Sequence, residues 1–229
     1  MTSPRTRART LAALAAAAAV LLSGCGALQP GTAVRINDDR VTMNDVDALA
    51  EAICTAETEG FKAQGMVLPG RYIRAEAAFK LFVEAAAAQY AAEHDIDPRP
   101  AYTQALSEAR PTIESLPTDQ REAYTDGVRA DAYVAAVITR VGEEALREQG
   151  VTEPEPGAAQ QQGGLLVQEW LATADIEFDP RIGLVLTDEG FQQVDTDTSF
   201  PVSDVAVRAR GDQPDPAWAG QLSPSLTCG

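Results

Sequence analysis

Residues 31–46 read Gly-Thr-Ala-Val-Arg-Ile-Asn-Asp-Asp-Arg-Val-Thr-Met-Asn-Asp-Val, and two structural elements can be predicted from them. The central pair, Asn37 and Asp38, tolerates left-handed backbone and favours a tight turn. The residues on either side of this pair are mainly apolar or β-branched. We therefore expect a small β-hairpin formed by residues 33–36 and 40–42.

The end of the same stretch predicts the first helix of the domain. Thr42 is followed three positions later by Asp45, as in a capping box, where two side chains satisfy free backbone N–H groups at a helix start. Apolar residues then recur at helical spacing and are expected to form the buried stripe: Val46, Leu49, Ala50 and Ile53.

A second strand signal lies far along the chain, in Asp175-Ile-Glu-Phe-Asp179. Ile176 and Phe178 alternate with acidic residues, and Pro180 ends the pattern. We expect this strand to complete a small sheet with the N-terminal hairpin.

Between the strand signals the chain is predicted to be helical. Amphipathic spacing favours helices over residues 71–93 and 101–109, the second interrupted by Pro111, and a long helix over residues 117–149. The composition of Gly150–Gly164 is typical of a linker, and a last helix is expected at residues 165–174.

The N-terminus has the features of a bacterial lipoprotein leader. Arg5, Arg7 and Arg9 precede an apolar run at residues 11–22, which is too short to span a bilayer. Leu22-Ser-Gly-Cys25 resembles a lipobox, so we expect residues 1–24 to be removed and Cys25 to carry acyl chains such as palmitate. The alternative is an ordinary secretory signal with a chance cysteine.

The composition restricts the partners of the mature chain. Removal of residues 1–24 takes away three arginines and no acid, which changes the formal net charge from −16 to −19. Such a chain is not expected to bind nucleic acid or anionic headgroups through its charge. The lipid on Cys25 would therefore hold it to the cell membrane on the extracytoplasmic side, through a tether at residues 25–31 that reaches about 20 Å.

Two further cysteines, Cys54 and Cys228, belong to a chain that leaves the reducing cytosol. We expect them to form a disulfide; two unpaired thiols are the alternative. A bond between them would close a loop of about 170 residues, for which the chain-entropy model gives a stabilisation on the order of 5 kcal/mol. The only histidine is His94 and no CxxC spacing occurs, so neither a zinc site nor a histidine-based catalytic set is expected, and no metal or cofactor is predicted.

The order of these elements resembles the N-terminal domain of the SurA family, whose members are exported chaperones and prolyl isomerases. The similar part covers residues 32–183, from the hairpin to Asp175-Ile-Glu-Phe-Asp-Pro-Arg-Ile-Gly183. The resemblance implies a mainly α domain with a small β-sheet, followed by an acidic, Pro/Gly-rich tail at residues 184–229. The alanine- and arginine-rich composition is that of an actinobacterial-type member.

The resemblance also implies a function. In isomerase members a parvulin domain lies where this chain has Gly150–Gly164, so no prolyl isomerase or other enzyme activity is expected. A noncatalytic, chaperone-like lipoprotein that binds exported or unfolded polypeptides is the leading hypothesis, and a scaffold for one folded envelope protein is the alternative. Six aromatic residues are candidates for client binding, although core packing would explain them as well: Phe79, Phe82, Tyr90, Tyr124, Tyr133 and Trp170.

Overall fold

The computed structural model describes residues 29–97, 102–187, 190–194, 200, 202–209 and 216–229, and Gly31–Gly229 form one compact unit. Its helices are α2 (Met43–Ala63), α3 (Gly70–Glu93), α4 (Tyr102–Ser115), α5 (Arg121–Glu148), α6 (Pro156–Leu171), α7 (Asp204–Ala209) and α8 (Pro216–Ala219). Its strands are β1 (Thr32–Ile36), β2 (Asp39–Thr42), β3 (Leu68–Pro69), β4 (Ile176–Phe178), β5 (Leu184–Thr187), β6 (Gly190–Gln193) and β7 (Thr227–Cys228). The prediction of a mainly helical domain with a small β-sheet is confirmed. None of the described helices is both long and apolar enough to cross a membrane.

The N-terminal hairpin and the late strand form one sheet, in the order β2-β1-β4. Asn37 lies at the turn with a φ of 50°, the left-handed conformation that its side chain tolerates. Val34 is paired with Phe178 and Ile36 with Ile176, so these apolar side chains share one face of the sheet. Both features agree with the prediction from the sequence.

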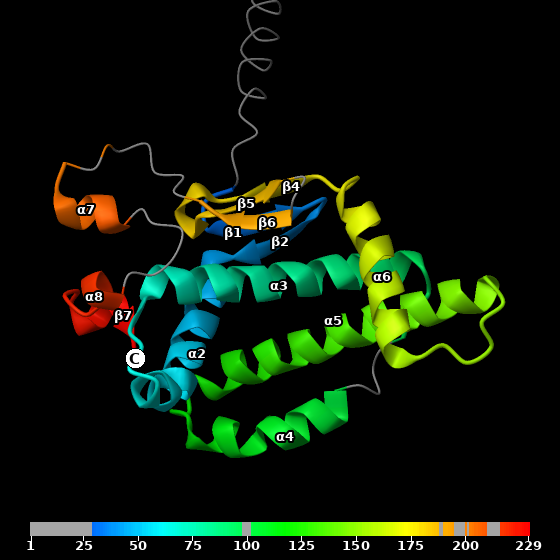
Figure 1. Cartoon of the computed structure of the whole chain (residues 1–229), viewed down its shortest axis with the longest axis horizontal. Helices are drawn as coiled ribbons and strands as arrows, with labels where there is room; N and C mark the ends of the chain where they lie inside the picture. Colours follow the sequence, from blue (N-terminus) through cyan, green and yellow to red (C-terminus); the bar gives the residue numbers. More distant parts are fainter. Residues whose placement is uncertain (1–28, 98–101, 188–189, 195–199, 201, 210–215) are drawn as a thin grey trace, which may run out of the picture. The chain divides into compact units, whose positions relative to one another are not determined.

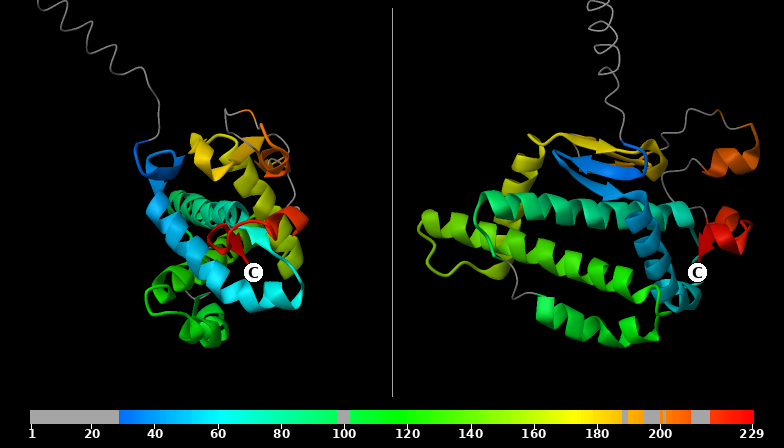
Figure 2. Two further views of the ribbon diagram at one scale, coloured as in Figure 1. Left: turned by 90° about the vertical axis from the view of Figure 1, so that its left-hand side faces the viewer. Right: turned by 180° about the vertical axis from the view of Figure 1, so that it is seen from behind.

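The sheet face packs on α3, and α2 crosses at one end (Figures 1 and 2). Thr42 and Asp45 form the expected capping box at the start of α2. Alanines on α3 allow close packing of the sheet and α2, and the ring of Phe82 is fully buried among them. This cluster is the main core, and a smaller one lies where α3, α5 and α6 meet.

The predicted linker at Gly150–Gly164 is wrong, because α6 begins at Pro156 and continues through both glycines at 163 and 164. Pro156 at the first position of a helix costs nothing, since the N–H that proline lacks would be unpaired there. Only residues 149–155 separate α5 from α6. Packing of α6 along α5 therefore overrides the low helix propensity of glycine.

Helix α4 also runs further than predicted, to Ser115 rather than to residue 109, with Pro111 inside it. Side chains complete its last turn: Ser115 Oγ donates to the Thr112 carbonyl (2.7 Å) and Arg121 Nη2 to the Glu114 carbonyl (2.9 Å). These bonds satisfy carbonyl groups that the helix end leaves free.

The structure also differs from the predicted domain end at residue 183. Strands β5 and β6 form a hairpin in what the sequence assigned to the tail, and Leu184 is buried in the main core. The chain then returns through α8 to β7, which pairs with β3. Apolar burial of this segment explains why the unit continues to Gly229.

Candidate binding groove

An open groove of about 910 Å³ is lined by α3, α5 and α6 and by strands β4, β5 and β6. In Figure 1, α6 crosses in front of α3, and the β5–β6 hairpin lies above α3. Helix α3 contributes Phe79 and Val83, and α6 contributes Val167 and Leu171. Glu177 is the only charged residue among the described residues of the lining. The groove is therefore an apolar surface that a partner would desolvate on binding.

Four phenylalanines from three parts of the chain pack together: Phe79, Phe178 and Phe191 line the groove, and Phe82 lies beneath them. The ring of Phe191 lies 5.0 Å from that of Phe79 and 5.1 Å from that of Phe82, both in edge-on geometry. Phe178 lies 5.2 Å from Phe82 and 6.0 Å from Phe191. These contacts fix the β5–β6 hairpin against α3, so one wall of the groove is held by aromatic packing.

The structure separates the two predicted phenylalanines. Phe79 is partly buried and lines the groove, so it is available to a bound segment. Phe82 is completely buried below it and serves as core. Phe79 and Phe82 are thus one helical turn apart on α3, and only Phe79 lies at the surface.

The other predicted aromatic residues lie outside the groove lining. Tyr90 and Trp170 pack edge to face with ring centroids 5.9 Å apart, and the Trp170 indole N–H donates to Glu93 Oε2 (2.8 Å). Tyr133 packs against the same smaller core cluster. Tyr124 lines a separate hollow between α2, α3 and α5.

The sequence did not identify Phe178, Leu186 and Phe191 as groove residues. The sequence pattern could have identified Phe178, because this residue alternates with acids in the predicted strand and shares an apolar face with Ile176. For Leu186 and Phe191 the signal is weaker: Leu184-Val-Leu-Thr and Gly190-Phe pair as a hairpin only because an aromatic cluster buries one of its faces.

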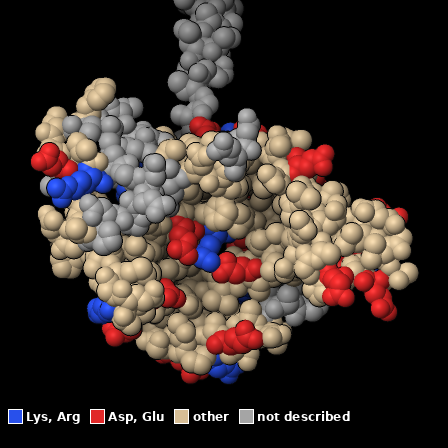
Figure 3. Space-filling model, viewed as in Figure 1, with Lys and Arg blue, Asp and Glu red and all other residues tan. Residues whose placement is uncertain are grey.

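A second, charged hollow of about 390 Å³ opens beside the groove. Figure 3 shows acidic and basic side chains gathered in the middle of this face. Lys80 Nζ lies 2.9 and 2.7 Å from the two carboxylate oxygens of Asp131, while Glu57 and Glu76 add two negative charges to the same lining. The hollow carries a net negative charge at one end of an apolar groove.

Two titratable side chains, Glu84 and His94, lie on α3 and at its C-terminal end. On α3, burial raises the pKa of Glu84, and the negative charge of Asp126 raises it further. The His94 ring stacks on the Tyr90 ring, with centroids 4.2 Å apart, so His94 packs against the end of α3. No group of His, Cys, Asp and Glu in the described residues could hold a metal ion.

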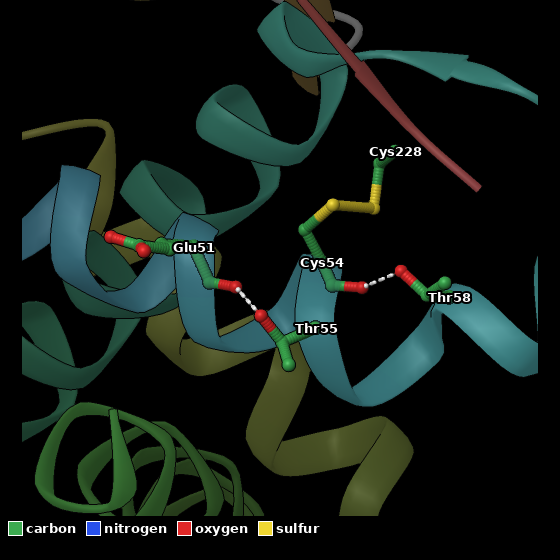
Figure 4. Close-up of a disulfide and its surroundings, with 5 residues drawn as sticks. All are labelled: Glu51, Cys54, Thr55, Thr58 and Cys228. Carbon is green, nitrogen blue, oxygen red and sulfur yellow. Dashed lines mark hydrogen bonds between the residues drawn. A yellow bond between two sulfur atoms is a disulfide. The ribbon is translucent and has the colours of Figure 1, made fainter. Parts of the chain in front are cut away.

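Cys54 on α2 and Cys228 on β7 form a disulfide, with their Cα atoms 5.4 Å apart (Figure 4). Around Cys54, the hydroxyl of Thr58 donates to the Cys54 carbonyl at 2.7 Å. Trp218 and Ala219 of α8 are buried beside β3. None of the described residues from 194 to 229 lines the groove.

Cys25 lies outside the described residues. Comparisons with protein-family models, with curated proteins and with solved structures give no match for this chain. The resemblance to the SurA family therefore rests on the sequence pattern alone.

Proposed function

We propose that this protein is a noncatalytic, chaperone-like lipoprotein that binds apolar segments of exported or unfolded polypeptides near the membrane. The observation that carries the proposal is the open groove of about 910 Å³, whose described lining is mainly apolar and contains one charged residue, Glu177. A folded protein rarely leaves such a surface uncovered unless it binds a partner. The lining residues of the groove come from α5, α6, α3, β4 and the β5–β6 hairpin.

The order of elements supports a SurA N-terminal-like fold. A β-hairpin leads into long helices, and a last helix leads into a strand that returns to the hairpin. In isomerase members of that family the parvulin domain stands between the long helices and the returning helix. Here residues 149–155 form the whole connection, which favours binding without prolyl isomerisation.

The proposed location follows from Cys25 and its short tether. Acyl chains on this residue would hold the domain within about 20 Å of the bilayer, where exported chains emerge. The net charge of −19 after removal of the leader would keep the domain from adhering to anionic lipid.

An aggregation assay tests the proposal. The mature chain with Cys25→Ser, mixed with a chemically unfolded globular protein at equal molar amounts, should reduce the light scattering that follows dilution of the denaturant. Unchanged scattering at several-fold molar excess would count against a chaperone function. Crosslinking in cells separates the alternative: many clients support a chaperone, whereas one stoichiometric folded partner supports a scaffold.

A further inference from the structure

The outer edge of β4, the strand at the end of the order β2-β1-β4, borders the groove. Hydrogen bonds from Asn37 N to Asp175 O and from Asp179 N to Ala33 O, both 2.8 Å, lie at the two ends of the β1–β4 ladder. In an antiparallel pair such bonds occur at every second residue, so Glu177 exchanges its bonds with Arg35. The N–H and C=O groups of Ile176 and Phe178 then point away from β1.

No described strand pairs with this edge, because β4 ends the order β2-β1-β4. All three residues of β4 line the groove, which places the free edge along its wall. An open edge of this kind is a ready template for an added strand, and proteins usually block it with charge, proline or a covering element.

The facing hairpin offers a second edge of the same kind. Its ladder includes a bond from Val194 N to Gly183 O (2.9 Å), and Val185 therefore pairs with Gln192 through the backbone. The backbone groups of Leu184 and Leu186 point away from β6, on a strand that also lines the groove. The side chain of Leu186 is 38% exposed, so it is open to a ligand.

The charges around the groove indicate which segments it prefers. Glu177 on β4 is paired with Arg35 (3.2 Å). The excess negative charge lies in the neighbouring hollow, where Glu57, Glu76 and Asp131 outnumber Lys80. Acidic groups at one end of an apolar site favour ligands with a basic residue at that end and increase their association rate. A second copy of this chain is a poor occupant, because two bodies with a formal charge near −19 repel each other.

We infer that the groove binds a polypeptide segment in extended form, by addition of a strand to the free edge of β4, and selects segments whose alternating apolar residues are flanked at one end by Lys or Arg. Main-chain hydrogen bonds to Ile176 and Phe178 supply affinity that is independent of sequence, and the groove accepts alternate side chains. The inference rests on the proposed function and specifies its ligand.

Peptide binding to the mature Cys25→Ser chain tests the inference. The probe is a short peptide that alternates Phe or Val with Thr and has Lys at both ends. One comparison peptide is N-methylated at every residue of the alternating segment, which removes the N–H donors on both edges of a strand. Another comparison peptide has Glu at both ends. The N-methylated peptide should bind at least about tenfold more weakly. The Glu peptide should also bind more weakly, by a factor that falls as salt is raised.

Each outcome has a distinct meaning. Equal binding of the N-methylated peptide overturns strand addition while leaving the groove as an apolar binding site. Equal binding of the Glu peptide overturns the preference for a basic end. Failure of every peptide to bind, with the protein folded, overturns the proposed function as well.

A matched pair of variants places the ligand on β4. Ile176→Pro removes an N–H and blocks the free edge of β4 with the pyrrolidine ring. Because this N–H faces away from β1, the β1–β4 ladder keeps its hydrogen bonds. Ile176→Ala removes the same side chain and keeps the N–H. The proline variant should bind the Lys peptide about tenfold more weakly than the alanine variant.

Amide hydrogen exchange gives a readout that needs no variant. The Ile176 and Phe178 amides should exchange more slowly when the Lys peptide is bound. Unchanged exchange at both amides with the site saturated would overturn the inference, and so would sedimentation of the free protein as a dimer that Ile176→Pro dissociates.

Discussion

Gly142 of α5 and Gly163 of α6 face each other at the point where the two helices cross. A Cβ on Gly142 would lie 2.8 Å from the backbone N of Gly163, and a Cβ on Gly163 would lie 3.0 Å from the backbone N of Gly142. Each would also overlap a carbonyl oxygen of the other helix, that of Ala159 or of Ile138. The backbones touch only because both residues lack a side chain, and this contact fixes α6 as a wall of the groove.

Substitution of either glycine should therefore destabilise the domain. Gly142→Ala or Gly163→Ala forces the helix backbones apart, at a cost of about 1–3 kcal/mol in the free energy of unfolding, measured with urea. Gly164→Ala is the matched control, because a Cβ there meets no atom within 4 Å. The control should be neutral or more stable by up to about 1 kcal/mol, since alanine favours a helix. Equal stability of Gly163→Ala and Gly164→Ala would contradict the close crossing.

This crossing also explains why the sequence predicts the second half of α6 but assigns residues 156–164 to a linker. Residues 156–164 contain three glycines and three glutamines, a composition that indicates a linker when it is judged locally. Gly163 is required by a contact with α5, which no local pattern contains. By contrast, the hairpin, the capping box and β4 depend on neighbouring residues, and these were predictable.

The site was predictable in part for a similar reason. Helical spacing identified Phe79 and Phe82 as apolar positions but could not tell which one the sheet would cover. Tyr90 and Trp170 pack on each other, and the Trp170 indole donates to Glu93, so these two large aromatic residues serve core packing rather than the groove. Phe191 becomes a groove residue only through its contacts with α3, more than a hundred positions earlier in the chain.

A charge placed in the groove should reduce binding without loss of the fold. Leu186→Glu puts a carboxylate on a residue that is 38% exposed and lines the groove, so an apolar ligand would have to desolvate the charge. We expect about tenfold weaker binding of an apolar peptide, measured by fluorescence anisotropy. Leu165→Glu is the control, since Leu165 is 57% exposed on α6 and lies outside the lining. Similar losses in both variants would argue against the groove as the binding site.

The Cys54–Cys228 disulfide should stabilise the domain without serving the groove. Its sequence separation is 174 residues, and removal of a bond that closes so long a loop should cost about 2–5 kcal/mol. The double variant Cys54→Ser/Cys228→Ser should unfold at lower urea concentration and still bind an apolar peptide when folded. Mass spectrometry of the oxidised protein, digested without reduction, should show the two cysteines linked. Alkylation of both thiols in that sample would disprove the bond.

Lipidation of Cys25 predicts a change in location. In a bacterial host, the full-length chain with Cys25→Ser should lose the acyl mass and move from the membrane fraction to the soluble exported fraction. The unsubstituted chain should begin at Cys25 after processing and carry lipid. If its N-terminus lies elsewhere and its mass shows no lipid, the leader is an ordinary secretory signal.

Glu84 predicts how stability depends on pH. Burial first, and the negative charge of Asp126 second, raise the pKa of this carboxyl in the folded state. A raised folded pKa means that the ionised form destabilises the fold above that pKa, and that the penalty disappears as pH falls to the ordinary value of a glutamate. Glu84→Gln should therefore increase the free energy of unfolding at pH 7, and the difference from the unsubstituted protein should shrink on acidification. Glu76→Gln, an exposed change on the same helix, should have a smaller effect on the free energy of unfolding at pH 7. A gain from Glu84→Gln that is unchanged at pH values below the ordinary pKa would mean that packing of the amide, rather than removal of the charge, stabilises the variant.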